Sequence, residues 1–290
     1  MEGIIIKKGY IYAIIAPILF GSAGLFIKLG YGTGLDSISI LTVQYILAVI
    51  LMFIVILIRN KKELKISKNK LFNLAILGIV GNTFMSIFYY KAFEYLPVSL
   101  VTILLYTYPI MVFIYSCVFK KEKISSKKIL AVVLAFIGCM CTLDFFHGKI
   151  QYSMIGIIFG ILCAVFYAFM NIYTESKLED IPPLIINAYS TLFALITILI
   201  YNPPVFLFKT NFSFESLFYI FILAVVCEVI PLTLLYSAIR YIGSLKVSVL
   251  GNLEIPSAVL LSFIFLKESI SPIQILGMVL VIFAAILIKK

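Results

Sequence analysis

Long apolar segments follow one another along the chain and are separated by short polar connections. A helix needs about 20 predominantly apolar residues to cross the hydrocarbon core of a bilayer. The pattern therefore predicts an all-α polytopic membrane protein with ten transmembrane helices. We place these helices at residues 9–29, 38–58, 71–92, 98–119, 129–145, 153–173, 184–201, 216–238, 245–266 and 272–288.

Two carboxylates interrupt the apolar pattern. Glu228 and Glu254 lie near the middles of the eighth and ninth predicted spans. A lone carboxylate at bilayer depth costs roughly 3 kcal/mol, so such residues usually face the protein interior and have a function. Pro231 and Pro256 follow them closely, and a proline removes a backbone donor and frees a carbonyl in the preceding turn. We therefore expect irregular helices beside both acids.

The chain contains an internal repeat. An offset of 146 positions aligns residues 90–125 with a later segment of the same pattern. The same offset places Asn82 opposite Glu228 and Tyr108 opposite Glu254. The acids therefore belong to the second half, and neutral polar groups hold the equivalent places in the first half.

The basic residues predict the orientation of the chain. Of the 23 Lys and Arg residues, 18 fall on the side of the N-terminus if the ten spans are correct, and five fall on the other side. Cytoplasmic loops of membrane proteins carry an excess of Lys and Arg. This distribution predicts a protein of the plasma or inner membrane with both termini in the cytoplasm. Because the positive charges lie between apolar spans, the net charge of +10 does not indicate a nucleic-acid partner.

The same charges predict how the two halves relate. The loop at residues 59–70 holds six basic residues, whereas its counterpart in the second half holds only Lys209. The loop at residues 120–128 holds five, and its counterpart holds only Lys267. Equivalent loops on opposite sides of the membrane indicate two inverted five-helix repeats. We assign the repeats to residues 1–148 and 149–290, with the joint at residues 145–153.

Small and polar residues form stripes on three spans. In the third span Gly78, Asn82 and Ser86 share a face, and in the ninth span a second set does so: Ser248, Gly251, Glu254, Ala258 and Ser262. We expect these two faces to point inward. In the sixth span the stripe consists of Gly156, Gly160, Ala164 and Ala168, which permits close helix packing.

Composition excludes several classes of protein. With 63% hydrophobic residues, 12% charged residues and a mean hydropathy of +1.16, the chain is not an ordinary water-soluble globule. The five cysteines lie in apolar segments, and we interpret them as packing residues. The single histidine, His147, lies in a polar connection near Asp144, so we expect no metal site, no cofactor and no enzyme activity. The chain has no phosphate-binding glycine loop, which excludes an ATP-driven pump.

The first span contains the segment LFGSAGLFIK, and the paired segments of the internal repeat end in FKKEKIS and FLKESIS. These motifs resemble those of the EamA-type branch of the drug/metabolite transporter superfamily. A proline, Pro109 or Pro256, precedes the glutamate of each paired segment by 13 or 12 residues. The chain departs from the family pattern where Phe20 replaces a common tryptophan and Gln44 a common arginine. The resemblance covers the whole chain.

The resemblance implies a carrier that moves small metabolites or drugs, often outward. It also implies a cavity similar to one lined by spans one, three, four, six, eight and nine. The candidate substrate-binding residues on those spans are Asn82, Tyr89, Tyr106, Tyr108, Glu228 and Glu254. For the tyrosines ordinary helix packing is an equal alternative, because the chain contains 18 of them.

These observations favour a secondary transporter that exports a cationic or zwitterionic amine, such as an amino acid, in exchange for protons. Desolvation disfavours the charged form of a carboxyl group, so an acid in the cavity is suited to proton transfer. We expect Glu228 to carry the proton and Glu254 to contact the amine. Three alternatives remain: a neutral metabolite bound by Asn82 and the tyrosines, a non-transporting receptor or scaffold, and an intramembrane enzyme.

Overall fold

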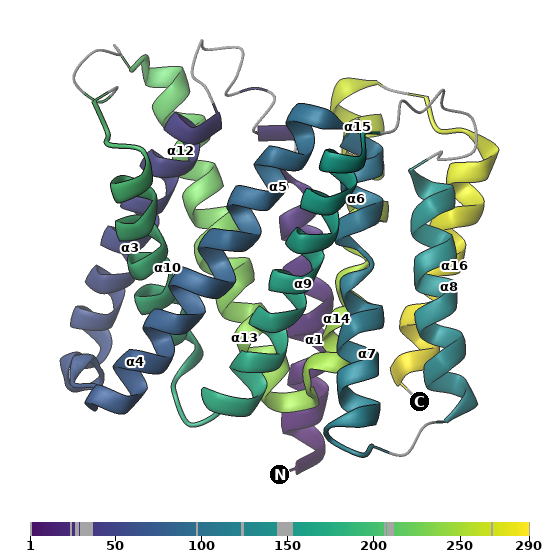
Figure 1. The fold of residues 1–290 in the computed structure, drawn as a ribbon, viewed down its shortest axis with the longest axis horizontal. Helices are drawn as coiled ribbons and strands as arrows, with labels where there is room; N and C mark the ends of the chain where they lie inside the picture. Colours follow the sequence, from purple (N-terminus) through teal and green to yellow (C-terminus); the bar gives the residue numbers. More distant parts are fainter. Residues whose placement is uncertain are drawn as a thin grey trace.

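The computed structural model describes residues 2–23, 25–26, 29, 37–96, 98–122, 125–143, 153–205, 207, 212–267 and 269–289. In these residues the secondary structure is entirely helical (Figure 1). The elements are α1 Glu2–Gly21, α3 Ser37–Asn60, η1 Lys61–Leu64, α4 Lys68–Ile76, η2 Leu77–Thr83, α5 Phe84–Tyr95, α6 Val98–Leu105, α7 Tyr108–Val118, α8 Ser126–Thr142, α9 Met154–Lys177, α10 Pro183–Tyr201, α12 Phe214–Ala224, η4 Val225–Val229, α13 Ile230–Ile242, α14 Ser244–Gly251, α15 Glu254–Leu266 and α16 Pro272–Lys289.

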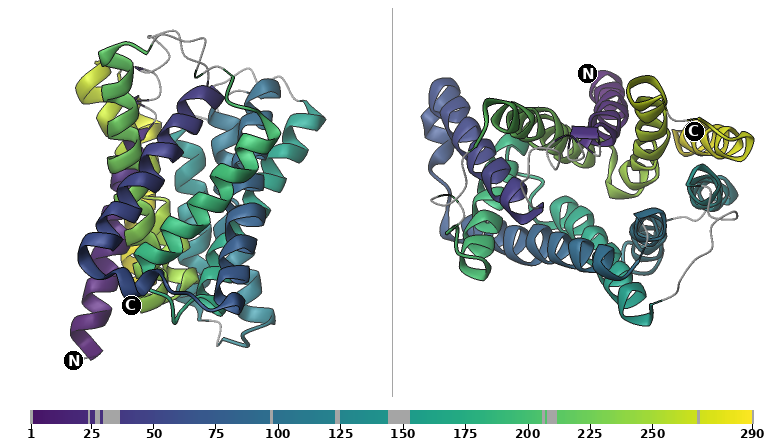
Figure 2. Two further views of the ribbon diagram at one scale, coloured as in Figure 1. Left: turned by 90° about the vertical axis from the view of Figure 1, so that its left-hand side faces the viewer. Right: turned by 90° about the horizontal axis from the view of Figure 1, so that it is seen from above.

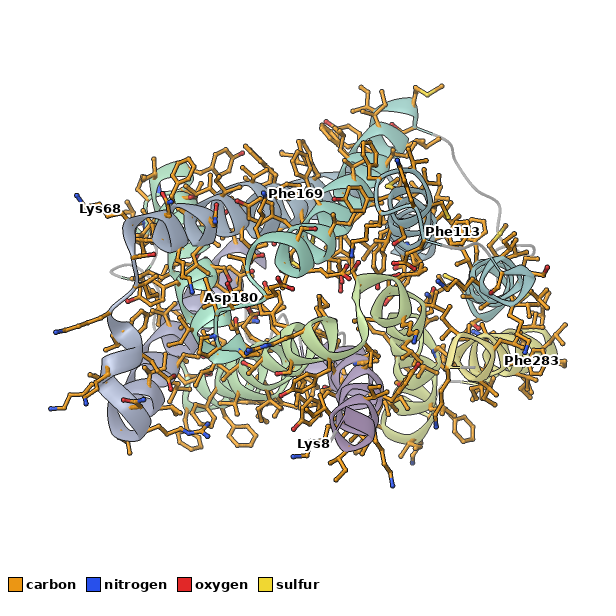
Figure 3. The ribbon with its side chains drawn as sticks, turned by 90° about the horizontal axis from the view of Figure 1, so that it is seen from below. Lys8, Lys68, Phe113, Phe169, Asp180 and Phe283 are labelled. Atoms are coloured by element: carbon orange, nitrogen blue, oxygen red, sulfur yellow. The ribbon has the colours of Figure 1, made fainter. Side chains whose placement is uncertain are left out.

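The described part of the chain contains nine helical stretches that are long and apolar enough to cross a membrane. Large apolar side chains cover their outer surface; Phe214 is 87% exposed and Phe119 is 71% exposed. Phe283 likewise lies at the outer edge of the bundle (Figure 3). Apolar residues in these numbers are stable on an outer surface only in contact with lipid. The protein is therefore a multi-pass membrane protein.

The fifth predicted span coincides with α8. This helix has 17 residues, at the lower limit of the length needed to cross the hydrocarbon core. The residues that follow it, 144–152, include His147 and the predicted joint between the halves, and lie outside the described residues, as does Glu268. The count of ten spans thus stays a prediction.

The first predicted span begins inside α1, which starts at Glu2 rather than at residue 9 and extends to Gly21. Of the residues that follow, 23, 25, 26 and 29 are also helical, and 24, 27 and 28 lie outside the described residues, so the end of this span at residue 29 stays a prediction. The segment that includes Lys7 and Lys8 is helical because a helix continues beyond the hydrocarbon core when exposed side chains carry the charges. The remaining predicted boundaries lie within a few residues of observed helix ends.

Irregular backbone occurs in four helical stretches. Two of them contain a π-helix: η2, which holds Asn82, and η4, which holds Glu228. The other two are broken into α6 and α7 and into α14 and α15, with Tyr108 and Glu254 as the first residues after the breaks. The irregularities next to Glu228 and Glu254 confirm the expectation drawn from the prolines.

The two broken helices are related by the offset of 146 positions. The first halves end at Leu105 and Gly251, and the second halves begin at Tyr108 and Glu254, so both ends obey the same offset. In Figure 1, α6 lies above α7, whereas α14 lies below α15. The two broken helices therefore run in opposite directions.

Close packing between helices occurs at small residues. A side chain on Gly156 would meet Leu96, and one on Gly160 would meet Leu104, so the predicted stripe of α9 packs against α5 and α6. At one edge of the bundle α8 packs along α16 (Figure 2), where Gly138 and Gly277 bring the two backbones together. Both chain termini lie at the same end of the bundle (Figure 1).

Candidate functional site

A cavity of about 190 Å³ lies between helices from both halves of the chain. Residues of α1, α3, η2, α5, α6, α9, η4, α13 and α15 line it. Its polar lining consists of Tyr45, Asn82, Ser86, Tyr89, Tyr167, Glu228 and Glu254. These helices include the six spans that the family resemblance implies, and α3 adds Leu41 and Tyr45 from the second span.

The structure brings four of the six candidate residues to this cavity: Asn82, Tyr89, Glu228 and Glu254. The other two, Tyr106 and Tyr108, do not line it. They are buried, 3% and 1% exposed, and lie behind the cavity wall.

The environment of Glu254 is aromatic. This residue begins α15, directly after the helix break, and the Tyr106 hydroxyl is its hydrogen-bonding neighbour. Behind it, Tyr108 packs against Tyr167 with ring centroids 4.3 Å apart and donates a hydrogen bond of 3.1 Å to the Ser248 carbonyl. The stack positions Tyr167, which is part of the cavity wall.

The environment of Glu228 is built from hydroxyl and amide groups. Glu228 is 8% exposed, and Thr191 Oγ1 lies 3.5 Å from its Oε1 atom. Asn187, one turn before Thr191 on α10, donates to the Val229 carbonyl at 3.2 Å and to Thr233 Oγ1 at 3.0 Å. Thr191 also donates to Asn187 Oδ1 at 3.0 Å. Asn187 thus fixes the π-helix η4, and with it the position of the Glu228 carboxyl group.

Asn82 faces the same region from η2. Its Nδ2 atom donates to Ser190 Oγ at 3.4 Å, and its Oδ1 atom is buried without a partner among the described residues. The Tyr236 hydroxyl lies among Ser190, Asn82 and Glu228, and it too makes no hydrogen bond of good geometry there. A buried polar group without a partner costs about 1–3 kcal/mol. Such groups next to a cavity are suited to bind water or a polar ligand.

The local sequence explains why these acids lie on irregular backbone. Pro231 lacks the amide that would donate to the carbonyl four residues earlier, at Cys227. Pro256 likewise cannot donate to the Asn252 carbonyl, which accepts from the Ile255 amide at 3.2 Å instead. The π-helix and the break occur at these places. π-Helical turns are frequent at functional sites because they redirect side chains and leave backbone carbonyls accessible.

Sequence analysis missed several residues of this region. Tyr45 and Tyr167 line the cavity, and Thr191 and Tyr236 lie beside Glu228. One signal was present in the sequence: Asn187, Ser190 and Thr191 have the spacing of one polar face on a helix. No comparable signal distinguishes Tyr45 or Tyr167 from the other tyrosines.

Toward the end of the bundle opposite the termini, a smaller cavity of about 90 Å³ shares Leu41 and Ser86 with the first cavity, and Lys91 and Tyr201 also line it. At the end that carries the termini, Lys120 Nζ forms an ion pair of 2.5 Å with Glu175 Oε1.

Within the described residues, His, Cys, Asp and Glu form no group that would hold a metal ion. The five cysteines are free; four are buried and Cys117 is partly exposed, as expected for packing residues. The chemistry of the cavity is therefore that of two carboxyl groups, an amide, hydroxyl groups and aromatic rings.

The sequence model of the EamA-like transporter family matches residues 7–143 and again residues 154–289. An uncharacterized transporter of Clostridium kluyveri is 22% identical over 97% of this chain and 93% of its own length. The uncharacterized transporter YcbK of Bacillus subtilis is 24% identical over 93% of this chain and 88% of its own length. A solved structure titled only as the crystal structure of a protein has the same fold, with a TM-score of 0.81, 14% identity and coverage of 97% of this chain and 96% of its own.

Proposed function

The chain belongs to the EamA-like transporter family, and from this membership we propose that it is a secondary-active exporter of a small cationic or zwitterionic amine, driven by exchange for protons. The family and its relatives make it a membrane transporter, which is generally not an enzyme. The observation that carries the proposal is one small cavity inside the bundle that is lined by two carboxyl groups, Glu228 and Glu254.

We propose an architecture of ten spans in two inverted repeats, residues 1–148 and 149–290. Three observations support it. The family matches the two halves separately. The broken helices α6–α7 and α14–α15 are related by the offset of 146 positions and run in opposite directions. The π-helices that hold Asn82 and Glu228 are related by the same offset. Inverted repeats around a central site are the usual basis of alternating access in secondary transporters.

The size of the cavity favours a small substrate. An engineered apolar cavity of about 150 Å³ binds benzene, and the cavity here measures about 190 Å³. A molecule the size of an amino acid or a small amine fits, whereas a large drug requires rearrangement of the walls. The walls favour positive charge, since aromatic faces such as those of Tyr89 and Tyr167 attract cations by roughly 0.5 to 2 kcal/mol each.

The different surroundings of the two acids suggest different roles. Glu228 is buried among Thr191, Asn82 and Tyr236 and is suited to hold a proton. Glu254 is partly exposed beside the aromatic wall and is suited to contact an amine. An arriving cation favours loss of the proton from Glu228, and departure of the cation favours its return. One proton then crosses the membrane for each positive charge moved the other way.

The direction of transport and the orientation of the chain complete the proposal. The termini lie at the same end of the bundle (Figure 1). The predicted spans put 18 of the 23 basic residues on the side of the N-terminus, which the positive-inside rule assigns to the cytoplasm. The smaller cavity that adjoins the site lies toward the opposite end, where an exporter releases its substrate. We therefore propose a protein of the cell membrane with both termini in the cytoplasm.

Purified protein in liposomes tests this function. Under an imposed pH gradient, a panel of amines, amino acids and small drugs should yield at least one compound whose flux dissipates the gradient. Glu228→Gln should retain exchange of labelled for unlabelled substrate and lose movement driven by protons. Glu215→Gln is the matched control, because Glu215 is exposed at the start of α12, away from the cavity.

Two outcomes contradict the proposal at different levels. Absence of flux for every compound under proton and sodium gradients would refute transport of this substrate class. Wild-type proton-driven flux in Glu228→Gln would refute the coupling role of Glu228 and would favour a neutral metabolite bound by Asn82 and the tyrosines, while leaving the transporter assignment intact.

A further inference from the structure

Three helices meet at the end of the bundle that carries the termini. Glu175, near the end of α9, forms an ion pair with Lys120, which follows α7. Its other carboxylate oxygen accepts a hydrogen bond of 2.5 Å from Ser244 Oγ at the start of α14. The preceding Gly243 has a φ of +83°, and a side chain there would sit 3.1 Å from the Glu175 carboxylate. We name this group of Lys120, Glu175 and Ser244 the latch.

Above the latch, α7, α9 and α14 are in mutual contact. Helical spacing puts Tyr108, Val112 and Ser116 on one face of α7 and Asn171 and Thr174 on one face of α9. Ser244, Ser248 and Asn252 lie on one face of α14. The upper ends of these faces are joined by the hydrogen bond from Tyr108 to Ser248, and the lower ends by the latch. The three faces therefore run together from the wall beside Glu254 to the surface.

Polar atoms without partners concentrate along this interface. Six buried side-chain polar atoms in the described residues have no hydrogen-bond partner, and four belong to α7, α9 or the residue after α14. They are Ser116 Oγ, Asn171 Oδ1, Thr174 Oγ1 and Asn252 Oδ1. An interface used only for packing is more stable with apolar residues of the same size at these positions. Their presence indicates a second state in which water reaches them.

We propose that the α7–α9–α14 interface is the closed half of the permeation route, and that the latch holds it shut. This inference rests on the proposed transport function. When the latch opens, α14 separates from α7 and α9, and the polar faces line a hydrated vestibule between the cavity and the end with the termini. Alternating access requires an opening at each end, and the smaller cavity that adjoins the site lies toward the other end.

The latch has the strength expected of a reversible closure. The side chains of Lys120 and Glu175 are 25% and 21% exposed, so solvent screens the ion pair. An exposed ion pair of this kind shifts the equilibrium between the closed and the open state by up to about fivefold. Glu175→Gln removes the charge and keeps the size of the side chain, so it should increase the open population by about twofold to fivefold.

Cysteine accessibility tests the proposal without any substrate. In a variant with alanine at the five native cysteines, Asn171→Cys and Ser116→Cys each introduce one thiol on the interface. Ala194→Cys is the control, because Ala194 is 0% exposed in the contact between α10 and α3. A membrane-impermeant maleimide is added to vesicles of either orientation, and the modification rate is followed by mass shift.

We expect modification of the two interface cysteines from the side of the termini and none of the control. Adding Glu175→Gln should raise both rates about twofold to fivefold. If Asn171→Cys does not keep the melting temperature of its background, Thr174→Cys replaces it. Interface cysteines that react no faster than the control from either side, or rates that do not respond to Glu175→Gln, would overturn the proposal. Because labelling needs no substrate, it separates this failure from a failure of amine transport.

Discussion

The close approach of Gly251 to Tyr108 predicts that Gly251→Ala destabilises the wild-type protein but stabilises the Tyr108→Phe variant. Gly251 is the last residue of α14, and a methyl group there would overlap the Tyr108 hydroxyl. The hydroxyl cannot rotate away freely, because it donates to the Ser248 carbonyl and its ring packs on Tyr167. Gly251→Ala should therefore strain the aromatic wall behind Glu254.

Two opposing terms set the magnitude. Alanine gains up to about 1 kcal/mol over glycine in a helix, whereas an extra methyl group in a packed interior costs about 1–3 kcal/mol. The net loss is about 0–3 kcal/mol. In Tyr108→Phe the overlapping oxygen is gone, and the nearest ring atom lies 3.7 Å from the new methyl group, an ordinary contact. In the Tyr108→Phe background, Gly251→Ala should therefore stabilise the folded protein by up to about 1 kcal/mol.

Tyr108→Phe alone should cost little. It removes one hydrogen bond, worth about 0.5–1.5 kcal/mol, and the Ser248 carbonyl still accepts from Asn252 Nδ2 at 3.2 Å. Thermal unfolding of the four proteins in one detergent measures the cycle. The expected coupling between the two substitutions is about 1–3 kcal/mol in favour of the double variant. Additive effects, with Gly251→Ala equally destabilising in both backgrounds, would refute the described contact.

Two further predictions concern the cavity and its walls. Glu254→Gln should weaken binding of a cationic amine by about tenfold to a hundredfold, since hydrogen bonds to charged groups contribute about 1.5–3 kcal/mol; a ligand-induced thermal shift measures this, and unchanged affinity would exclude Glu254 as the amine contact. Gly78→Ala should lower the melting temperature more than Gly81→Ala, because a methyl group at Gly78 meets the backbone carbonyl of Ser190 whereas one at Gly81 meets only the flexible side chains of Leu77 and Met170. Equal melting temperatures of the two variants would contradict this packing.

Much of the fold could be predicted from the sequence. Apolar length located the spans, and the prolines after Glu228 and Glu254 located irregular backbone, because a missing amide is a local property of the chain. The offset also paired Tyr108 with Glu254, and both residues follow helix breaks. The start of the first helix could not be located from apolar length, because α1 continues through Lys7 and Lys8 to Glu2.

The candidate site could be predicted from the sequence only in part. Asn82 and Glu228 stood out because polar groups are rare in apolar spans, and both line the cavity. Tyr106 and Tyr108 were chosen for their chemistry, but the turn between α6 and α7 places them behind the wall. Tyr45 and Tyr167 line it instead, because the approach of α3 and α9 depends on packing between distant segments. Such packing leaves no local signature in sequence.

The pairing of α8 with α16 has a consequence for the order of biosynthesis. Gly138 and Thr142 on α8 pack against Gly277 on α16. At about 5–20 residues per second, α8 leaves the ribosome on the order of ten seconds before α16 exists. During that interval its small-residue groove faces lipid or an insertion chaperone. A nascent chain that stalls after the first half therefore presents the groove to any other helix with a matching glycine, including α8 of a second nascent chain.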